Sequence, residues 1–400
     1  MHGSEERILT THVGSLIRPP LFLELLRRIE ADQPYDTAAY ERTLKSSVKE
    51  IVQDQARTGL DIVSDGEFGK SRNWAYYVHD RLGGIERRAM TEAERNNPAA
   101  STLSGRDRQA FPEFYAELDE ATGLKTRASF KLACTGPIVY RGHTELRRDI
   151  ANLKEAAAEA GVTNAFLPVV APSSALTGAQ NLYYPDDRSF IFALADALRE
   201  EYRTIVDAGL IVQIDDAALP FQYERMVPPA TLSEYKAWAE IRIEALNHAL
   251  EGIPIERSRY HICWGSWNGP HMFDIEMKDM VDLLLKVRVG AYLFEAANPR
   301  HEHEWRVWET TRLPDGKVIV PGVISHATNV VEHPELVAQR IVRFAKLVGR
   351  ENVMAGTDCG FAQSPLARRV HPTIMWAKLQ SLVAGARLAS AELWGRSLTA

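Results

Sequence analysis

The sequence predicts an α/β protein whose strands form a parallel sheet or a barrel, and three observations indicate this fold class. Short apolar runs of β type alternate with longer segments in which apolar residues recur at helical spacing. Such an alternation of strand and helix patterns is typical of a parallel sheet with helices packed against it. At 400 residues, the chain is also long enough for two ordinary domains or for one large barrel with insertions.

Nine runs have the length and composition of strands, and several longer segments between them have a helical period. The runs lie near residues 9–15, 61–66, 128–135, 164–171, 209–215, 258–264, 290–296, 317–324 and 352–358. The helical segments include residues 38–58, 188–207, 231–250, 274–288 and 334–348. A (β/α)8 barrel needs one strand fewer, so we expect one of the nine runs to lie outside the barrel or not to be a strand.

The polar stretch 86–125 interrupts this alternation and contains the sequence Asn-Asn-Pro-Ala-Ala-Ser-Thr. Clusters of Asn, Pro, Ser and Thr between periodic segments are typical of long loops. We predict that this stretch is an insertion over one face of the fold, within a single domain that spans residues 1–400. Neither an internal repeat nor a low-complexity tract is evident.

Charge and hydrophobicity exclude several classes of function. The net charge is −6 and no basic run is concentrated in the chain, so nothing predicts a nucleic-acid partner. The charged start is not followed by a signal-type apolar core, and no apolar stretch is long enough to span a bilayer. We therefore expect a cytoplasmic protein without a membrane partner. The oligomeric state stays open, with a homo-oligomer among the options.

Four residues that can bind a metal ion lie at the ends of strand-like runs: His261, Cys263, Glu295 and Cys359. His261 and Cys263 stand two apart in a β-type run, so both side chains point to the same face and can reach one ion. Glu295 and Cys359 each follow a short apolar run, which is where an α/β protein collects its functional residues. Such donors form tetrahedral zinc sites, although a buried His or Cys is also a common core residue. From spacing alone, both alternatives stay open.

Several segments occur in the order of the signature segments of a known family. They are residues 10–15, 63–67, 134–137, 213–216, 261–263, 323–326 and 358–360, together with Glu295. Over these segments, from about residue 9 to residue 363, the chain resembles the C-terminal catalytic barrel of cobalamin-independent methionine synthase. It also resembles the single-barrel relatives that include epoxyalkane:coenzyme M transferase and, in fold, the uroporphyrinogen decarboxylase-like barrels. The resemblance implies one (β/α)8 TIM barrel with loop insertions.

The resemblance also implies roles for the candidate residues. His261, Cys263, Glu295 and Cys359 fall on the family's zinc ligands, so the implied cofactor is Zn2+. Glu295 is the ligand expected to give way to a substrate thiol, whose sulfur then attacks an electrophilic carbon at neutral pH. His326 matches a histidine that assists proton transfer at the donor side, which suits imidazole because its pKa lies near neutrality. Judged without the resemblance, His326 is instead a residue that caps or hydrogen-bonds a loop.

Three further residues, Ser15, Glu67 and Asp215, match positions that hold the amino-acid part of homocysteine in the synthase. Two carboxylates can clamp an ammonium group, while the backbone around Ser15 can meet a carboxylate. A thiol that carries a sulfonate and no amine, such as coenzyme M, should be repelled by Glu67 and Asp215. An aminothiol acceptor is therefore favoured. The alternative is that both acids are loop residues paired with arginines.

The sequence departs from the synthase near the expected zinc site. The family's Ile-Asp-Glu-Pro-Ala segment is Ile214-Asp-Asp-Ala-Ala here. The stretch between Cys263 and Glu295 is longer and adds side chains that either reshape a pocket or pack in the core, namely Trp264, Trp267, His271 and Met272. No pterin site is identified. Four basic residues are candidates for anion contacts or are solvated surface charges, namely Arg18, Lys70, Arg72 and Arg141.

Three other residues carry weaker signals. Cys134 precedes Thr-Gly-Pro at a predicted strand end, and we interpret it as a buried thiol in preference to a cavity residue. His301 and His303, in Arg-His-Glu-His-Glu, imitate a metal cluster beside Glu295. Residues two apart on a helix face different directions, so we do not expect these histidines to share a ligand role.

We therefore predict an enzyme that performs zinc-dependent methyl or alkyl transfer to a substrate thiol, with homocysteine methylation to methionine as the leading assignment. Its partners would be a small-molecule thiol and a methyl or alkyl donor, whose identity the sequence leaves open. One alternative is alkylation of another thiol, including epoxide opening by coenzyme M. Another is a zinc-free decarboxylase of the same barrel superfamily, which leaves Cys263 and Cys359 unexplained. A zinc-storing or thiol-sensing binding protein is the alternative outside enzymology, and its closed site should ignore added thiols.

Overall fold

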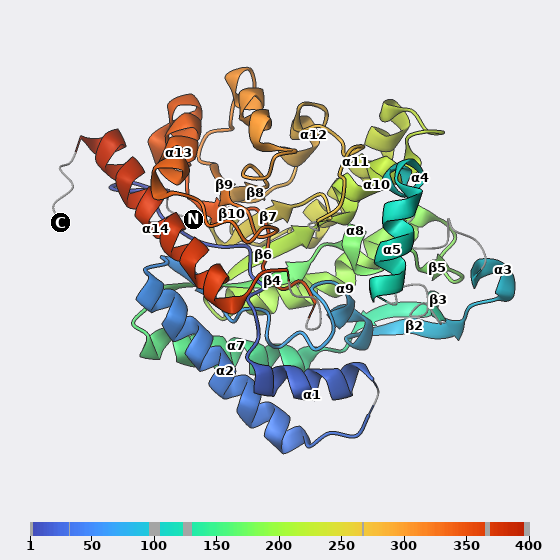
Figure 1. Ribbon diagram of the computed structural model, residues 1–400. Helices are drawn as coiled ribbons and strands as arrows, with labels where there is room; N and C mark the ends of the chain where they lie inside the picture. The colour runs from blue at the N-terminus through green and yellow to red at the C-terminus, as the bar shows by residue number, and fades with distance from the viewer. Residues whose placement is uncertain are drawn as a thin grey trace.

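A parallel sheet of seven strands forms the centre of the molecule (Figure 1). The structure is a computed structural model that describes residues 3–31, 33–95, 105–122, 130–265, 268–364 and 369–395. Neighbouring strands in the sheet are all parallel. In spatial order they are β1 (Ile62–Ser64), β4 (Asn164–Val170), β6 (Ile211–Asp216), β7 (Ser258–Ile262), β8 (Ala291–Phe294), β9 (Val318–Ile324) and β10 (Gly356–Thr357).

The segment around Thr10 joins the two edges of this sheet. On one side, Thr10 forms a parallel bridge with Ala355, and Thr11 N donates to Ala355 O at 3.0 Å. On the other side, Asp61 N and Ile62 N donate to Thr10 O at 3.1 and 3.2 Å. With this segment as an eighth strand, the sheet closes on itself. The predicted (β/α)8 barrel is therefore confirmed.

Helices surround the strands on the outside of the barrel (Figure 1). The helices that follow the sheet strands or lie beside them are α2 (Thr37–Thr58), α7 (His143–Glu159), α9 (Asp187–Asp207), α11 (Leu232–Ala249), α12 (Met277–Leu284), α13 (Pro334–Val348) and α14 (Pro372–Trp394). The predicted helical segments correspond to α2, α9, α11, α12 and α13, although α12 is shorter than its segment. Shorter helices lie in the connections: α1 (Pro20–Glu30), α8 (Pro172–Ala175), α10 (Ala218–Met226), and the 3-10 turns η1 (Tyr76–Asp80), η3 (Ile255–Arg257), η4 (Glu302–Glu309) and η5 (Arg350–Asn352).

Local sequence signals fix the ends of these helices. Helix α2 begins after Asp36, whose side chain accepts a hydrogen bond from Ala39 N, and ends at Gly59 with φ at 93°. Helix α11 begins with a capping box, in which Thr231 and Glu234 satisfy each other's backbone N–H groups. These caps hold the helices that follow the Thr10 segment and β6, and so help to place the loops at the carboxyl ends of the strands.

The surplus ninth run lies outside the barrel. Residues 130–135 of the predicted run belong to β3 (Phe130–Tyr140), while residues 128 and 129 fall outside the described ranges. Strand β3 pairs antiparallel with β2 (Leu82–Ala89) and parallel with the short β5 (Gln180–Asn181), in a separate three-stranded sheet. Its local pattern resembles that of a barrel strand, and only its pairing distinguishes it.

The predicted insertion 86–125 contains the end of β2 and the helices α3 (Glu92–Arg95), α4 (Arg106–Ala110) and α5 (Pro112–Thr122). Its described part contacts loops at the carboxyl ends of the strands. Asp107 N donates to Glu224 Oε1 of α10 at 2.8 Å, and Asp107 accepts from Met272 N at 3.1 Å. Arg106 Nη2 donates to Phe273 O at 3.1 Å. The described part of this segment therefore lies against the end of the barrel where the predicted functional residues gather.

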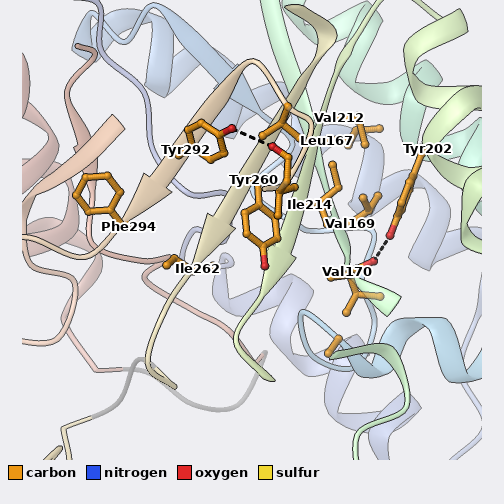
Figure 2. Packing of buried hydrophobic residues seen from close by; sticks show 14 of the residues in the cluster. Leu167, Val169, Val170, Tyr202, Val212, Ile214, Tyr260, Ile262, Tyr292 and Phe294 are labelled. Atoms are coloured by element: carbon orange, nitrogen blue, oxygen red, sulfur yellow. Dashed lines mark hydrogen bonds between the residues drawn. The ribbon is translucent and has the colours of Figure 1, made fainter. Parts of the chain in front are cut away.

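Alternation along the strands divides the buried residues into two sets. One set packs between the strands and the helices, and Figure 2 shows Ile214, Tyr260 and Tyr292 among its members. In the same view Tyr202 of α9 donates its hydroxyl to Val170 O at 2.6 Å. The second set fills the barrel interior with residues from many strands, including Ile62, Phe166, Ile211, Leu293 and Val320. Among the described residues, no helix combines the length and hydrophobicity that a bilayer span requires.

Candidate metal centre and active site

The inner face of the barrel carries most of the predicted site residues. Strand β6 pairs in register with β7, so that Asp215 lies opposite His261, and His261 in turn lies opposite Leu293 of β8. Because side chains alternate along a strand, Cys263 follows His261 on the same face, and Glu295 follows Leu293 on its face. Strand alternation thus directs these polar groups into one end of the barrel interior.

Three of the four predicted metal ligands meet at this end. One donor atom each from His261, Cys263 and Cys359 lies within 4.8 Å of the other two, and all three residues are buried. The three cysteines of the chain are free thiols, so neither Cys263 nor Cys359 is taken by a disulfide. Both ring nitrogens of His261 are buried and lack a hydrogen-bond partner within the described ranges. An unsatisfied buried imidazole is costly, whereas metal coordination would satisfy it, so a nitrogen and two sulfurs here fit zinc.

The two sulfurs have opposite electrostatic preferences. Burial opposes ionisation of Cys359, but the Cys263 thiol and the His261 imidazole outweigh burial and lower the pKa of Cys359 well below its ordinary value. Proximity to Cys359 and burial raise the pKa of Cys263 well above its ordinary value. Burial lowers the pKa of His261, yet the adjacent Cys359 sulfur raises it overall. Cys359 is therefore the first of the two thiols to become a thiolate, the form that binds metals.

The structure places Glu295 beside this group and not within it. Glu295 Oε1 accepts a hydrogen bond from Trp264 N at 3.1 Å, and Oε2 accepts from Asn298 Nδ2 at 2.6 Å. Burial raises the pKa of Glu295, although nearby His301 works in the opposite direction. Asp358 Oδ1 fixes the same loop, because it accepts from the backbone N–H groups that follow Glu295 at 2.8 Å each.

A cavity of about 390 Å³ opens in front of the sulfur and imidazole donors. All three residues predicted to bind the acceptor line it, as do three aromatic residues, Trp74, Tyr76 and Phe221. The residues that bear on the argument are Ser15, Glu67, Asp215, His261, Cys263, Cys359, Arg369, Trp74 and Phe221. The donor group and the proposed acceptor residues thus share one cavity.

Glu67 and Asp215 form an acidic side of this cavity. Burial raises the pKa of Glu67, and burial raises the pKa of Asp215 to about 7. Glu67 Oε1 lies 3.6 Å from Lys70 Nζ, while its buried Oε2 has no hydrogen-bond partner among the described residues. Asp215 Oδ1 accepts from Gln213 Nε2 at 2.7 Å. Among the described residues, neither Glu67 nor Asp215 forms an ion pair with an arginine. The cation paired with Glu67 is Lys70, and Arg18 donates to the Glu67 backbone oxygen at 2.7 Å.

His326 is not among the described residues that line the cavity. It is buried near Cys359, and its Nε2 lies 3.2 Å from Arg369 Nη1. A guanidinium can only donate, so His326 Nε2 accepts in this pair. Arg369 lines the cavity and its pKa is lowered by burial, with Cys359, Cys263 and Glu295 acting in the opposite direction. The sequence reasoning missed Arg369, because no local pattern distinguishes it from a surface arginine.

The four basic candidates have other environments. Arg18 is buried and donates to backbone oxygens, and Lys70 is the neighbour of Glu67. Arg72 pairs with Asp80 at 2.7 Å, and Arg141 is exposed.

The residues with weaker sequence signals do not belong to the group of three metal donors. Cys134 is buried in β3, where its thiol donates to Gly136 O at 3.3 Å. His301 is buried and His303 is exposed, as expected for two histidines that do not share a ligand role. Met272 is exposed at 54%. The candidate Trp267 lies outside the described residues.

Comparisons with known proteins agree with this geometry. The model of the family described as "Cobalamin-independent synthase, Catalytic domain" matches residues 129–374. The chain is 26% identical to 2-hydroxypropyl-CoM lyase of Xanthobacter autotrophicus, over 98% of each chain. It is 23% identical to methionine synthase of Saccharolobus solfataricus, over 96% of this chain and 95% of that one. In fold it is similar to a B12-independent methionine synthase from Shewanella sp. W3-18-1, with a TM-score of 0.69, 20% identity and coverage of 97% of this chain and 99% of that chain.

Proposed function

The chain belongs to the cobalamin-independent synthase catalytic-domain family, and from that premise we propose that it catalyses zinc-dependent transfer of a methyl or alkyl group to a substrate thiol. One observation carries the proposal. Donor atoms of His261, Cys263 and Cys359 lie within 4.8 Å of one another on the wall of a cavity large enough for small substrates. Zinc bound there would act as a Lewis acid that makes a substrate sulfur nucleophilic at neutral pH.

We propose homocysteine as the leading acceptor. Glu67 and Asp215 are buried carboxyl groups whose raised pKa values reflect the cost of holding negative charge there. An ammonium group between them would remove much of that cost, because it supplies the opposite charge and hydrogen-bond donors. Ser15, on the same cavity wall, adds a hydroxyl for the carboxylate of the same substrate. The methionine synthases among the relatives support this assignment.

A second candidate acceptor is a sulfonated thiol such as coenzyme M. Arg369 lines the cavity near Cys359 and Cys263, and forms no ion pair with a carboxylate of the described residues. A guanidinium in this setting suits a sulfonate or carboxylate. The relative named 2-hydroxypropyl-CoM lyase supports this alternative. Between the two candidates, the acidic pair favours the aminothiol.

For His326 we propose proton transfer at the leaving atom of the alkyl donor. Arg369 Nη1 donates to His326 Nε2, so that nitrogen carries no proton and the ring proton of a neutral imidazole sits on Nδ1. The transferred carbon leaves an atom that gains an electron pair and needs a proton. A buried imidazole near Cys359 can supply or relay that proton, as histidine does in general acid–base catalysis.

The test is X-ray absorption at the zinc edge of the purified protein, titrated separately with homocysteine, coenzyme M and glutathione. The proposal expects about one zinc per chain and one additional zinc–sulfur bond with the physiological acceptor alone. A spectrum that no thiol changes would favour a zinc-storage or sensing protein. Full activity after chelation of the metal would favour a zinc-free reaction such as decarboxylation.

A further inference from the structure

His301 lies between two carboxylates in the loops that border the donor group. Its Nδ1 lies 2.8 Å from Glu304 Oε2, and its Nε2 lies 3.1 Å from Asp274 Oδ2. A neutral imidazole donates through one nitrogen only, so a ring flanked by two carboxylates is best satisfied when both nitrogens carry protons. Asp274 also accepts from His271 Nδ1 at 2.9 Å. Burial opposes the charge, yet Asp274 and Glu304 raise the pKa of His301 to about 10. His301 is therefore a buried imidazolium.

This imidazolium stacks on Trp264. The two ring centroids are 4.0 Å apart and the planes differ by 24°. A cation over an indole face is a favourable contact, and more so when water is excluded. Trp264 Nε1 donates to Ile275 O at 2.8 Å, which fixes the other edge of the ring. Trp264 follows Cys263 directly, and its backbone N–H donates to Glu295 Oε1.

The second oxygen of Glu295, Oε2, is bound by Asn298, which is itself hydrogen-bonded to His301. Asn298 Nδ2 donates to Glu295 Oε2 at 2.6 Å, and Asn298 Oδ1 accepts from the backbone N–H of His301 at 3.0 Å. His301 thus contacts both donors to Glu295, Trp264 through its ring and Asn298 through its backbone. Each oxygen of the carboxylate has one donor from this array.

We propose that Trp264, Asn298 and His301 form a cradle that binds the Glu295 carboxylate beside the His261, Cys263 and Cys359 donors, and so weakens the hold of Glu295 on the metal enough for the substrate thiol to take its place. Within this cradle, Trp264 and Asn298 contact Glu295, while His301 is a positioning residue that acts through them. The inference rests on the proposed function, because it assigns the cradle a role in thiol binding at the metal.

The donors of the cradle and the metal compete for the Glu295 carboxylate. Hydrogen bonds to a charged acceptor are stronger than those between neutral groups, so two donors draw Glu295 away from the metal. If one of these donors is lost, Glu295 binds the metal more tightly, and an incoming thiol then has to displace a stronger ligand. Partners of metal ligands commonly change metal affinity or activity by about 10- to 100-fold. Because His261, Cys263 and Cys359 hold the metal independently of the cradle, we expect the cradle to change thiol affinity more than metal content.

The test uses Asn298→Asp, which has the same shape and keeps the Oδ1 acceptor for His301, but replaces the donor to Glu295 with a second carboxylate. Asn298→Ala removes the donor without adding charge and serves if the first variant does not fold. His303→Gln is the matched control, because His303 is exposed and lies in the same Arg-His-Glu-His-Glu motif. Each protein is loaded with cobalt(II) at pH 8 and titrated with homocysteine and with 2-mercaptoethanesulfonate. The readouts are cobalt per chain and the sulfur-to-cobalt absorption band.

We expect the Kd of the better-bound thiol to rise about tenfold in Asn298→Asp, less in Asn298→Ala and not at all in His303→Gln, with equal cobalt content throughout. Equal thiol affinity in all four proteins would overturn the cradle while leaving the proposed function intact. A variant that loses cobalt would show that Asn298 holds the metal site together and would also overturn the cradle as stated. Wild-type protein that binds cobalt but no thiol, or no cobalt at all, would overturn both proposals.

Discussion

Asp215→Asn is the most direct test of which thiol this cavity accepts. The substitution keeps the shape of the side chain and an acceptor for Gln213, whose Nε2 donates to Asp215 Oδ1 at 2.7 Å. It removes one of the two negative charges on the acidic side of the cavity. Glu67 remains, with Lys70 at 3.6 Å from Oε1 and with no hydrogen-bond partner for Oε2 in the described part of the chain. The variant therefore changes the charge seen by an amine while leaving the metal donors in place.

The expected magnitude follows from the contact that is lost. A hydrogen bond between a charged donor and a charged acceptor contributes about 1.5–3 kcal/mol, so kcat/KM for homocysteine should fall about 10- to 150-fold. A thiol without an amine loses nothing. For 2-mercaptoethanesulfonate, the removal of a nearby like charge should leave kcat/KM unchanged or raise it. The ratio of the two kcat/KM values is thus expected to change by at least tenfold.

The assay compares kcat/KM for the two thiols with one alkyl donor, in the wild type, in Asp215→Asn and in a control, Asp282→Asn. Asp282 is exposed and pairs with Lys236, so its substitution should alter neither value. Zinc content is measured in parallel, so that loss of metal is not mistaken for loss of a substrate contact. An equal decrease for both thiols at unchanged zinc would refute an ammonium contact at Asp215. A wild type that prefers the sulfonated thiol would refute the aminothiol assignment itself.

Four other predictions concern separate parts of the molecule. His326→Asn should lower kcat by about 100-fold or more at unchanged zinc content, as expected for loss of a proton-transfer group; equal activity would remove His326 from the reaction. Cys359→Ser should weaken zinc binding by at least about tenfold in a chelator competition, because it replaces the lowest-pKa thiol of the site. Burial raises the pKa of Asp65 to about 7, so the folded protein keeps a proton that the unfolded chain releases near 3.8. The contribution of Asp65 to stability should therefore be complete below about pH 4 and fall by up to about 1.4 kcal/mol per pH unit as the pH rises to about 7. Asp65→Asn should reduce the slope in denaturant unfolding by that amount, while Asp215, whose pKa is also raised to about 7, keeps its own share. A Cβ on Gly360 would overlap Ser15 Oγ, so Gly360→Ala should cost about 1–3 kcal/mol of stability and raise the KM for the acceptor thiol.

The alternation of side chains along strands explains why much of the site could be predicted. Asp215, His261 and Cys263 occupy positions whose facing is set by period two, a property that the sequence displays directly. Their convergence needs only that β6 and β7 be parallel neighbours, which the alternation of strand and helix patterns already indicates. Cys359 follows the short strand β10 by the same logic, and its sulfur reaches the other two donors.

Other parts of the site depend on contacts that no local pattern records. The partners of Glu295 come from Trp264, which lies 31 residues away, and from the loop that contains Asn298. Helical spacing correctly separated His301 from His303, yet it could not reveal that His301 pairs with Asp274 across 27 residues of sequence. For the same reason, the run 128–135 could not be distinguished from a barrel strand, because strand pairing is decided by the whole sheet.

Asp215 and Asp216 show how the same alternation assigns two adjacent acids to different tasks. Asp216 accepts from Tyr260 Oη at 2.9 Å, from Ser174 Oγ at 2.8 Å and from Leu219 N at 3.2 Å. Both of its oxygens are therefore committed to joining β6 to its neighbours and to the start of α10. Both acids line the cavity, but Asp215, on the opposite face of the strand, lies next to His261 and has fewer hydrogen bonds to the protein. The change from Asp-Glu to Asp-Asp in this segment thus falls on the acid whose two oxygens are already hydrogen-bonded within the protein, and Asp215 keeps its charge and its length for a substrate amine.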